Sequence, residues 1–176
     1  MIVLGIDPGP VTHGAVLYDS DHLHTRRLTR RVLWSSKAIT SFDLLDYLIR
    51  KWAKPDAIVI ERPAAMGALG VGIVGHMLDT AWEAGAMSKG LSLHGYVVCT
   101  MTRREVLRNL GVLSGKGSSD ARVRAACIAD HETPGGPPAV GRKASPGPLY
   151  GLSSHSWQAL GLVLAWLNFQ TKGNEQ

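Results

Sequence analysis

The sequence predicts a single α/β domain in which five strands and five helices follow one another in the order β-β-β-α-β-α-β-α-α-α. Three observations lead to this prediction. The apolar runs 2–7 and 57–61 have the length and composition of buried strands, and each ends on an acid. The amphipathic segment 40–53 lies between them, so a right-handed crossover would leave both strands parallel and adjacent. The two-residue link Ser20-Asp21 is of hairpin length, which indicates an antiparallel start to the sheet.

Each element follows from hydrophobic periodicity and from helix-capping residues. Predicted strands occupy residues 2–7, 13–19, 22–34, 57–61 and 93–100, and predicted helices occupy residues 40–53, 69–89, 103–110, 118–131 and 153–169. The expected N-caps of these helices are Ser41, Thr102, Ser118 or Ser119, and Ser153 or Ser154. The Pro- and Gly-rich segment 133–153 is a long connection, which in a compact domain is more often functional than idle. We expect one domain over residues 1–172 and a short disordered tail over residues 173–176.

Composition favours a soluble protein with a polyanionic partner. The chain has 19 Lys and Arg against 14 Asp and Glu, which gives a net charge of +5. This balance suits nucleic acid, although many soluble proteins are mildly basic without binding it. Cys99 and Cys127 stand far apart in no CxxC pair, which argues against a disulfide scaffold or a zinc site. The longest apolar stretch, 63–78, is shorter than the ~20 residues of a spanning helix, and Met1 leads straight into a strand, so we expect a cytoplasmic protein without leader or membrane anchor.

Asp7 and Glu61 each end a predicted strand, and these two strands are expected to lie side by side. Their carboxylates would then meet at the carboxyl edge of the sheet, where open α/β sheets bind ligands. Two like charges so close repel each other unless a cation shares them, and carboxylate oxygens suit Mg²⁺ or Mn²⁺. Two such ions about 4 Å apart can activate water and stabilise the leaving oxygen in phosphodiester hydrolysis. The alternative is that each acid merely ends its strand or pairs with a cation such as Arg62.

The last predicted helix offers two further candidate ligands, His155 and Gln158. They stand three residues apart and therefore face the same way. His155 lies in the first turn, ahead of the apolar positions, and this helix would have to pack near the acidic edge. Without the pair Asp7 and Glu61, a histidine that merely lies near a helix start would explain His155 equally well.

Four segments, in this order, resemble the RuvC family of Holliday-junction resolvases: GIDPG, AIVIE, GKGSSDARVRAA and SSHSWQALGLVLAW. The match covers most of the chain. The resemblance implies a ribonuclease-H-like fold with a five-stranded mixed sheet. It also implies a homodimer that grips a four-way DNA junction and cuts two strands of like polarity. Hydrolysis would depend on a pair of Mg²⁺ or Mn²⁺ ions in each active site, with Asp7, Glu61 and His155 matching the family's ligands.

Two positions depart from the family pattern. Gln158 stands where the family usually has an Asp, and an amide offers a metal a carbonyl oxygen but no charge. Three explanations stay open: a divergent branch, viral for example, that works with this set; compensation by another acid, Asp120; or an inactivated form. The loop after Glu61 lacks the aromatic wedge that relatives stack at the junction, so Met66 or Leu69 would have to serve there.

Basic side chains that could hold DNA lie in several segments. They are Arg26, Arg27, Arg30 and Arg31 on the third predicted strand, Arg103, Arg104 and Arg108 on one short helix, Lys116, Arg122 and Arg124 around the GKG turn, and Arg142 and Lys143 in the long connection. We expect Lys116 and Lys143 to contact phosphates near the cut site. Further nucleic-acid contacts are predicted for Arg122, Arg142 and Met66. For the cluster on the third strand, a solvated edge strand explains the charges equally well.

The leading functional prediction is a structure-selective endonuclease that resolves four-way DNA junctions. Gln158 supports a different class, a junction-binding protein whose catalysis is weakened or lost. A nuclease for other branched DNA or for RNA is an alternative within the same fold. A sugar-kinase-like ATPase half also opens with an Asp-Gly strand turn, but the chain is too short for the duplicated domain. A branch-migration partner is compatible with these motifs and is not encoded in them.

Overall fold

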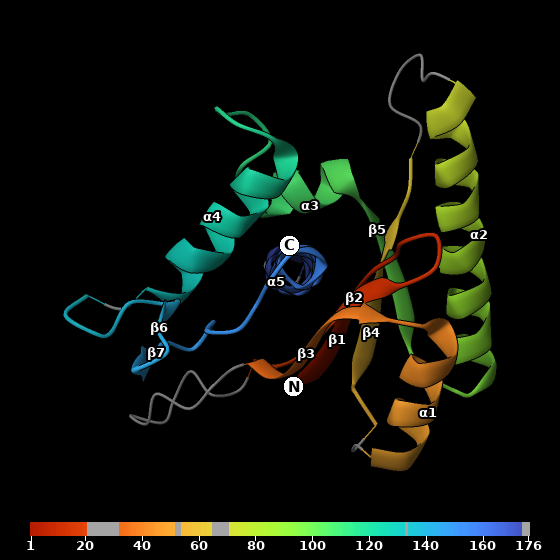
Figure 1. The fold of residues 1–176 in the computed structure, drawn as a ribbon, viewed down its shortest axis with the longest axis horizontal. Helices are drawn as coiled ribbons and strands as arrows, with labels where there is room; N and C mark the ends of the chain where they lie inside the picture. Colours follow the sequence, from red (N-terminus) through yellow and green to blue (C-terminus); the bar gives the residue numbers. More distant parts are fainter. Residues whose placement is uncertain (21–31, 52–53, 65–70, 133, 174–176) are drawn as a thin grey trace.

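The computed structural model describes residues 1–20, 32–51, 54–64, 71–132 and 134–173 of the chain. A five-stranded sheet lies at the centre, with its strands in the order β3-β2-β1-β4-β5 (Figure 1). The strands are β1 (Ile2–Asp7), β2 (His13–Asp19), β3 (Val32–Ile39), β4 (Ala57–Arg62) and β5 (Val98–Thr102). The helices are α1 (Ser41–Lys51), α2 (Val71–Leu93), α3 (Arg103–Asn109), α4 (Ser119–His131) and α5 (His155–Gly173). A small hairpin, β6 (Gly141–Arg142) with β7 (Ser145–Pro146), lies in the connection before α5.

The sheet is mixed, as the sequence predicts. β1 pairs antiparallel with β2, and β2 with β3, whereas β1 and β4, and β4 and β5, run parallel. In the parallel pair β1–β4, Ile6 is the register partner of Ile60. The next residue on each strand is an acid, Asp7 on β1 and Glu61 on β4. The two acids therefore end neighbouring strands at the same edge of the sheet.

Helix α5 covers one face of the sheet, and Figure 1 shows it nearly end-on between the strands and the layer of α3 and α4. Every residue from Ser156 to Trp166 is buried. The helix approaches the strands so closely that a Cβ on Gly5 would lie 2.3 Å from the carbonyl oxygen of Ala159. A Cβ on Gly14 would lie 2.5 Å from atoms of His155. These two glycines therefore set the height of α5 above the acidic edge.

Helices α1 and α2 cover the opposite face (Figure 1). Side chains alternate along a strand, so Leu4 and Ile6 of β1 and Ile58 and Ile60 of β4 point to this face and pack in one apolar cluster with Leu44 of α1. A second cluster lies on the α5 face, so the core consists of two apolar layers, one on each side of the sheet. No helix in the described part of the chain is both long enough and apolar enough to cross a membrane.

The third strand lies later in the chain than predicted. β3 spans Val32–Ile39, whereas the predicted strand 22–34 falls mostly within residues 21–31, outside the described part of the chain. The predicted link Ser20-Asp21 and the arginines of the third predicted strand also fall at or within that segment. Periodicity missed the second half of β3 because it reads SSKAI. An edge strand pairs on one side only and tolerates such exposed polar residues.

The fifth strand also differs from the prediction, because the preceding helix is longer than expected. α2 continues to Leu93 instead of ending near Lys89. The chain then turns at Gly95, where φ is 77°, a backbone conformation that favours glycine. β5 accordingly spans Val98–Thr102 rather than residues 93–100.

Two of the predicted helix caps are confirmed and one is wrong. Thr102 caps α3 and Ser118 caps α4. At α1, Thr40 rather than Ser41 accepts the hydrogen bond from the backbone N–H of Asp43, because Ser41 is already the first helical residue.

The last helix ends later than predicted. α5 starts at His155, directly after Ser154, one of the two predicted cap positions, whose φ is 44°. The helix runs to Gly173, so residue 173 is helical rather than part of a tail. The other residues of the predicted tail, 174–176, lie outside the described part of the chain.

Candidate active site

Asp7 and Glu61 lie at the edge of the sheet, on the face that α5 covers. Strand alternation places Asp7 on the same side of β1 as Val3, which packs in the apolar cluster of α5. Glu61 shares its side of β4 with Val59 in the same cluster. Both acids are buried. An ionised carboxylate in such surroundings is costly unless it is paired or hydrogen-bonded.

His155, the first residue of α5, lies directly against Asp7. Its Nδ1 is 2.8 Å from Asp7 Oδ2. The close approach of the helix at Gly14 makes this contact possible. The imidazole is largely exposed, so one of its nitrogens faces Asp7 while the ring stays open to solvent. The structure thus brings His155 together with Asp7 across nearly the full length of the chain.

Arg103, which the sequence reasoning did not place in the site, lies between the two acids. Its Nε is 3.0 Å from Glu61 Oε1, and its Nη2 is 3.9 Å from Asp7 Oδ1. Arg103 directly follows β5, which runs parallel to β4, so it reaches the same edge as the acids. The rule that found the acids would have found Arg103 as well, had β5 been predicted to end at Thr102. A cation does pair with Glu61, as the alternative interpretation held, but it is Arg103 rather than Arg62.

Burial raises the pKa of both acids. Desolvation is the largest cause for Glu61 and raises its pKa to about 7, opposed by the charge of Arg103 and reinforced by that of Asp7. Desolvation also raises the pKa of Asp7, against the hydrogen bond from His155 and the charge of Arg103. A single arginine therefore does not offset the burial of two carboxylates, and the site still attracts positive charge.

Gln158, the departure from the family pattern, is buried between Arg103 and Asp120. Its Oε1 accepts a hydrogen bond from Arg103 Nη1 at 2.6 Å, and its Nε2 donates to the backbone oxygen of Asp120 at 3.5 Å. The carboxylate of Asp120 is exposed, with Oδ1 3.8 Å from Arg103 Nη2. Asp120 therefore lies on the solvent side of the site, and its carboxylate approaches the site at Arg103.

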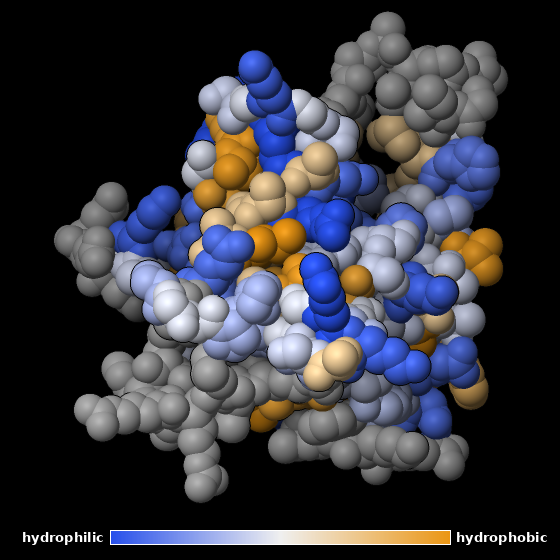
Figure 2. Space-filling model, turned by 60° about the vertical axis from the view of Figure 1, so that its left-hand side comes forward, coloured by the Kyte–Doolittle hydropathy of each residue, from blue (hydrophilic) through white to orange (hydrophobic). Residues whose placement is uncertain are grey.

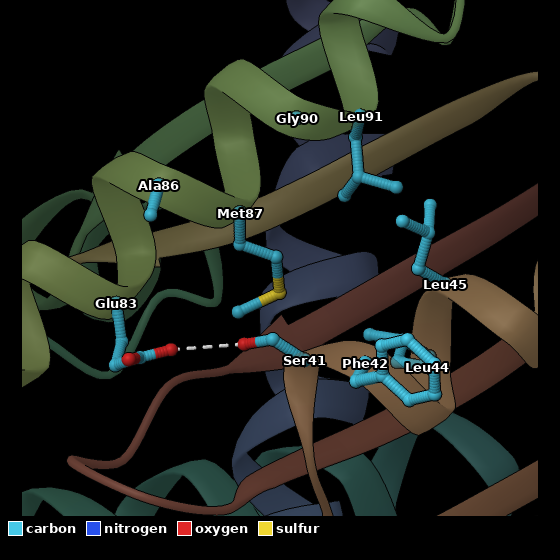
Figure 3. Close-up of a pocket in the computed structure, with 9 residues that line it drawn as sticks. All are labelled: Ser41, Phe42, Leu44, Leu45, Glu83, Ala86, Met87, Gly90 and Leu91. Carbon is cyan, nitrogen blue, oxygen red and sulfur yellow. Dashed lines mark hydrogen bonds between the residues drawn. The ribbon is translucent and has the colours of Figure 1, made fainter.

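The turn that follows Asp7 is fixed by a buried histidine, His13. The backbone N–H of Gly9 donates to His13 Nδ1 at 3.3 Å, and His13 Nε2 lies 2.9 Å from Ser41 Oγ. Ser41 in turn donates to Glu83 of α2 at 2.9 Å, the dashed contact in Figure 3. Burial lowers the pKa of His13, with the charge of Glu83 opposing, so the ring is neutral and can accept from Gly9. This chain of contacts holds the turn behind Asp7 against α1 and α2.

A cleft of about 460 Å³ opens beside the site, between α4 and the start of α5. Its polar lining consists of Asp120, Arg124, Ser153, Ser154, His155 and Gln158. The guanidinium of Arg124 lies over the Trp157 ring, 5.2 Å from the centroid. Figure 2 brings the α4 side of the molecule forward, and hydrophilic side chains cover much of that face. The cleft gives a ligand from solvent access to His155 and Gln158.

The residues predicted to contact nucleic acid differ in their exposure and in their contacts within the fold. Lys116 is exposed in the loop before α4, and Arg142 and Lys143 are exposed at the β6–β7 hairpin. Arg122 has another role in the fold: its Nη1 donates to the backbone oxygens of residues 112 and 113, both at 2.7 Å. Met66 lies outside the described residues. The DNA contacts of all five residues stay predictions.

The two carboxylates are of the chemistry that a hard divalent cation prefers. Glu61 Oε2 is buried and has no hydrogen-bond partner among the described residues. Carboxylate oxygens are the ligands that Mg²⁺ and Mn²⁺ prefer. In the same part of the chain, no group of three or more His, Cys, Asp or Glu side chains is arranged to hold a metal ion. Asp7 and Glu61 thus suit a divalent ion, with His155 adjacent to Asp7 as a further donor.

Comparison with known proteins finds similarity in structure and not in sequence. No family model matches the chain, and no curated protein matches it. Among solved structures, the chain is similar to Thermus thermophilus RuvC in complex with a Holliday junction substrate, with a TM-score of 0.64 and 16% sequence identity over 98% of this chain and 97% of that chain. Another Thermus thermophilus RuvC structure matches with a TM-score of 0.56 and 18% identity over the same shares. The five-stranded mixed sheet flanked by helices is therefore ribonuclease-H-like, as predicted.

Proposed function

We propose that the protein is a divalent-metal-dependent endonuclease that resolves four-way DNA junctions. The observation that carries this proposal is the buried pair Asp7 and Glu61 at the carboxyl edge of the sheet, with one oxygen of Glu61 unpartnered. Two buried carboxylates that share one arginine call for a further cation. The ribonuclease-H-like fold supports a nuclease, and the structure of similar fold that contains a Holliday junction supports the substrate class.

Asp7 and Glu61 would hold Mg²⁺ or Mn²⁺, with His155 as a further ligand. When bound, the ion supplies an activated water and stabilises charge on the leaving oxygen. The strands fix both carboxylates, because each follows a residue paired in the β1–β4 ladder. The first turn of α5 fixes His155 against Asp7. The chain thus orients its ligands through the sheet and through one helix end.

DNA would be held by exposed basic side chains outside the acid pair. Among the five residues predicted to contact nucleic acid, Lys116, Arg142 and Lys143 are exposed, and all three lie in loops or at a hairpin. Phosphate contacts of this kind make affinity fall steeply with salt. Selectivity for a branched substrate would come from the shape of the DNA and the spacing of two subunits rather than from base edges.

The homodimer that this function requires would form on the α1–α2 face. Phe42 of α1 is 79% exposed and Trp82 of α2 is 77% exposed, and Leu78 lies one turn before Trp82. Beside them an apolar pocket of about 300 Å³ opens between the two helices, and Figure 3 shows Met87 and Phe42 on its walls. Exposed apolar side chains next to an apolar pocket suit contact with a second copy, in which the two surfaces repeat each other by symmetry.

A cleavage assay on a labelled four-way junction tests the proposal. The protein is incubated with the junction in Mn²⁺ or Mg²⁺, and in EDTA, beside a linear duplex of the same sequence. We expect paired, symmetric nicks in the junction with metal and none in EDTA, and no nicks with Asp7→Asn or Glu61→Gln. Failure both to cut and to shift the junction in a gel overturns the proposal.

A junction-binding protein without catalysis is the second candidate, and one observation favours it. Arg103 and Gln158 contact each other inside the site, so a cation is already present beside the carboxylates. In the same assay this candidate shifts the junction without cutting it in any metal. Cutting that is lost in Glu61→Gln excludes it.

A further inference from the structure

Arg103 is held inside the candidate site rather than at its rim. Its side chain is 18% exposed. Nε contacts Glu61 Oε1 at 3.0 Å, and Nη1 donates to Gln158 Oε1 at 2.6 Å. Nη2 points toward Asp7 and Asp120, at 3.9 and 3.8 Å, which is beyond hydrogen-bond distance. Two of the three nitrogens are therefore engaged, and the third has donors left for another oxygen.

Gln158 has the chemistry to hold this arginine. Its buried amide accepts from Arg103 on one side and donates to the backbone oxygen of Asp120 on the other. A carboxylate at position 158 could not make the second contact, because an ionised acid has no donor. An amide meets both partners and adds no negative charge beside Asp7 and Glu61. Arg103 thus competes with a metal for the amide oxygen of Gln158.

The charges of the buried groups point the same way. Asp7 and Glu61 carry two negative charges when ionised, and Arg103 returns one positive charge. One divalent ion leaves these three buried groups with a net charge of +1, which the exposed carboxylate of Asp120 offsets. A second divalent ion would bring two further positive charges close to a fixed guanidinium, with a neutral amide in place of the carboxylate that would balance them.

We propose that Arg103, held by Gln158, is a built-in cation that takes the place of one of two divalent ions, so that the centre formed by Asp7 and Glu61 binds a single ion. This inference rests on the proposed function. The free Nη2 donors then face the substrate phosphate, where a guanidinium binds oxygen in a fixed direction. Gln158 is a positioning residue, and its neutral side chain is a compensated change rather than a lost ligand.

Metal stoichiometry tests the inference without DNA. Isothermal titration of the full chain with Mn²⁺ at pH 8 should give one ion per chain. Arg103→Gln should bind the first ion at least tenfold more tightly, because the competing charge is gone, and Arg103→Gln with Gln158→Asp should bind two ions. Arg103→Lys should keep one ion with an affinity within about threefold of the parent. Arg104→Gln removes the same charge from the exposed neighbouring position and should change nothing.

The outcomes separate this inference from the proposed function. Two ions, or none, on the parent protein overturn the inference, whether or not the variants fold. Equal effects of Arg103→Lys and Arg103→Gln also overturn it, because a role in folding alone would not distinguish charge. A parent that binds one ion but cuts no junction overturns the nuclease and leaves the built-in cation standing. A parent that cuts junctions with two ions bound supports the nuclease and overturns the built-in cation.

Discussion

The two faces of the sheet are closed to different degrees. On one face, α5 is buried from Ser156 to Trp166 and is itself covered by α3 and α4 (Figure 1). On the other face, α1 and α2 form a single layer whose outer side carries exposed Phe42 and Trp82 beside an apolar pocket. Alternation along β1 and β4 sends Asp7 and Glu61 to the closed face.

This difference indicates that the two faces of the sheet have different functions. The closed face excludes water, which raises the pKa of its acids and strengthens every charge contact among them. The open face has no comparable cluster of buried charges among the described residues; His13 and Glu83 are its nearest equivalent. Chemistry therefore belongs to the α5 face, and association with a second copy is proposed for the α1–α2 face.

Substitution of a glycine under α5 should give the largest effect. A Cβ at Gly5 would lie 2.3 Å from the backbone oxygen of Ala159, which cannot move without the helix. Gly5→Ala should therefore lower the free energy of unfolding by about 3 kcal/mol or more, measured by urea denaturation. An unfolding midpoint equal to that of the parent would show that α5 is not pressed against the sheet.

A charge on the open face should affect association and not folding. Trp82→Glu should weaken dimerisation by about 2 kcal/mol, roughly 30-fold in Kd, because it places a charge in an apolar contact. Sedimentation equilibrium gives the Kd, and circular dichroism checks the fold. Phe169→Glu, an exposed apolar position near the end of α5, is the matched control and should leave the Kd unchanged. A monomeric parent protein would contradict the proposed dimer face.

The acid pair should make the metal-free protein less stable as pH rises. The pKa of Glu61 is raised from 4.5 to about 7, so the folded protein keeps a proton that the unfolded chain loses first. The stability that this proton contributes is complete below about pH 4.5 and is lost as pH rises through about 7. The loss should be on the order of 2–3 kcal/mol, and smaller in Glu61→Gln. Urea denaturation in EDTA between pH 4.5 and 8 measures it, and an equal slope in both proteins would contradict the raised pKa of the buried Glu61 carboxyl.

A glycine on the open face should give the smallest effect, with opposite sign to Gly5. A Cβ at Gly85 of α2 meets nothing within 4 Å. Gly85→Ala should raise the free energy of unfolding by about 0.5–1 kcal/mol, the gain in helix propensity. The measurement is best made in the Trp82→Glu background, so that association does not contribute. Destabilisation there would mean that the open face is packed within one chain.

Much of the fold could be predicted from the sequence because the buried strands are strongly patterned. The runs ending at Asp7 and Glu61 gave the parallel pair, and the rule on carboxyl edges brought both acids together. His155 followed from the start of a long apolar helix. Each of these patterns lies within one short segment of the sequence, so it can be recognised without knowledge of the rest of the fold.

The remainder depends on contacts that no local pattern contains. Arg103 was missed because the fifth strand was predicted to end at residue 100, whereas β5 continues to Thr102 and Arg103 follows it directly. The role of Gln158 appears only when Arg103 and Asp120 are seen on either side of its amide. The second half of the edge strand β3 was missed because a strand that pairs on one side only does not need the alternation on which periodicity depends.

The contact of α5 with Gly5 and Gly14 has a consequence for sequence drift. There the helix meets the strands mainly through main-chain atoms of Ala159 and His155, so a rotamer change, such as one at Val163, can alter the spacing only slightly. Replacement of neighbouring side chains would leave the distance between His155 and Asp7 almost untouched. A chain of this architecture can therefore exchange many other residues and still hold His155 beside Asp7, provided that glycine is kept at positions 5 and 14.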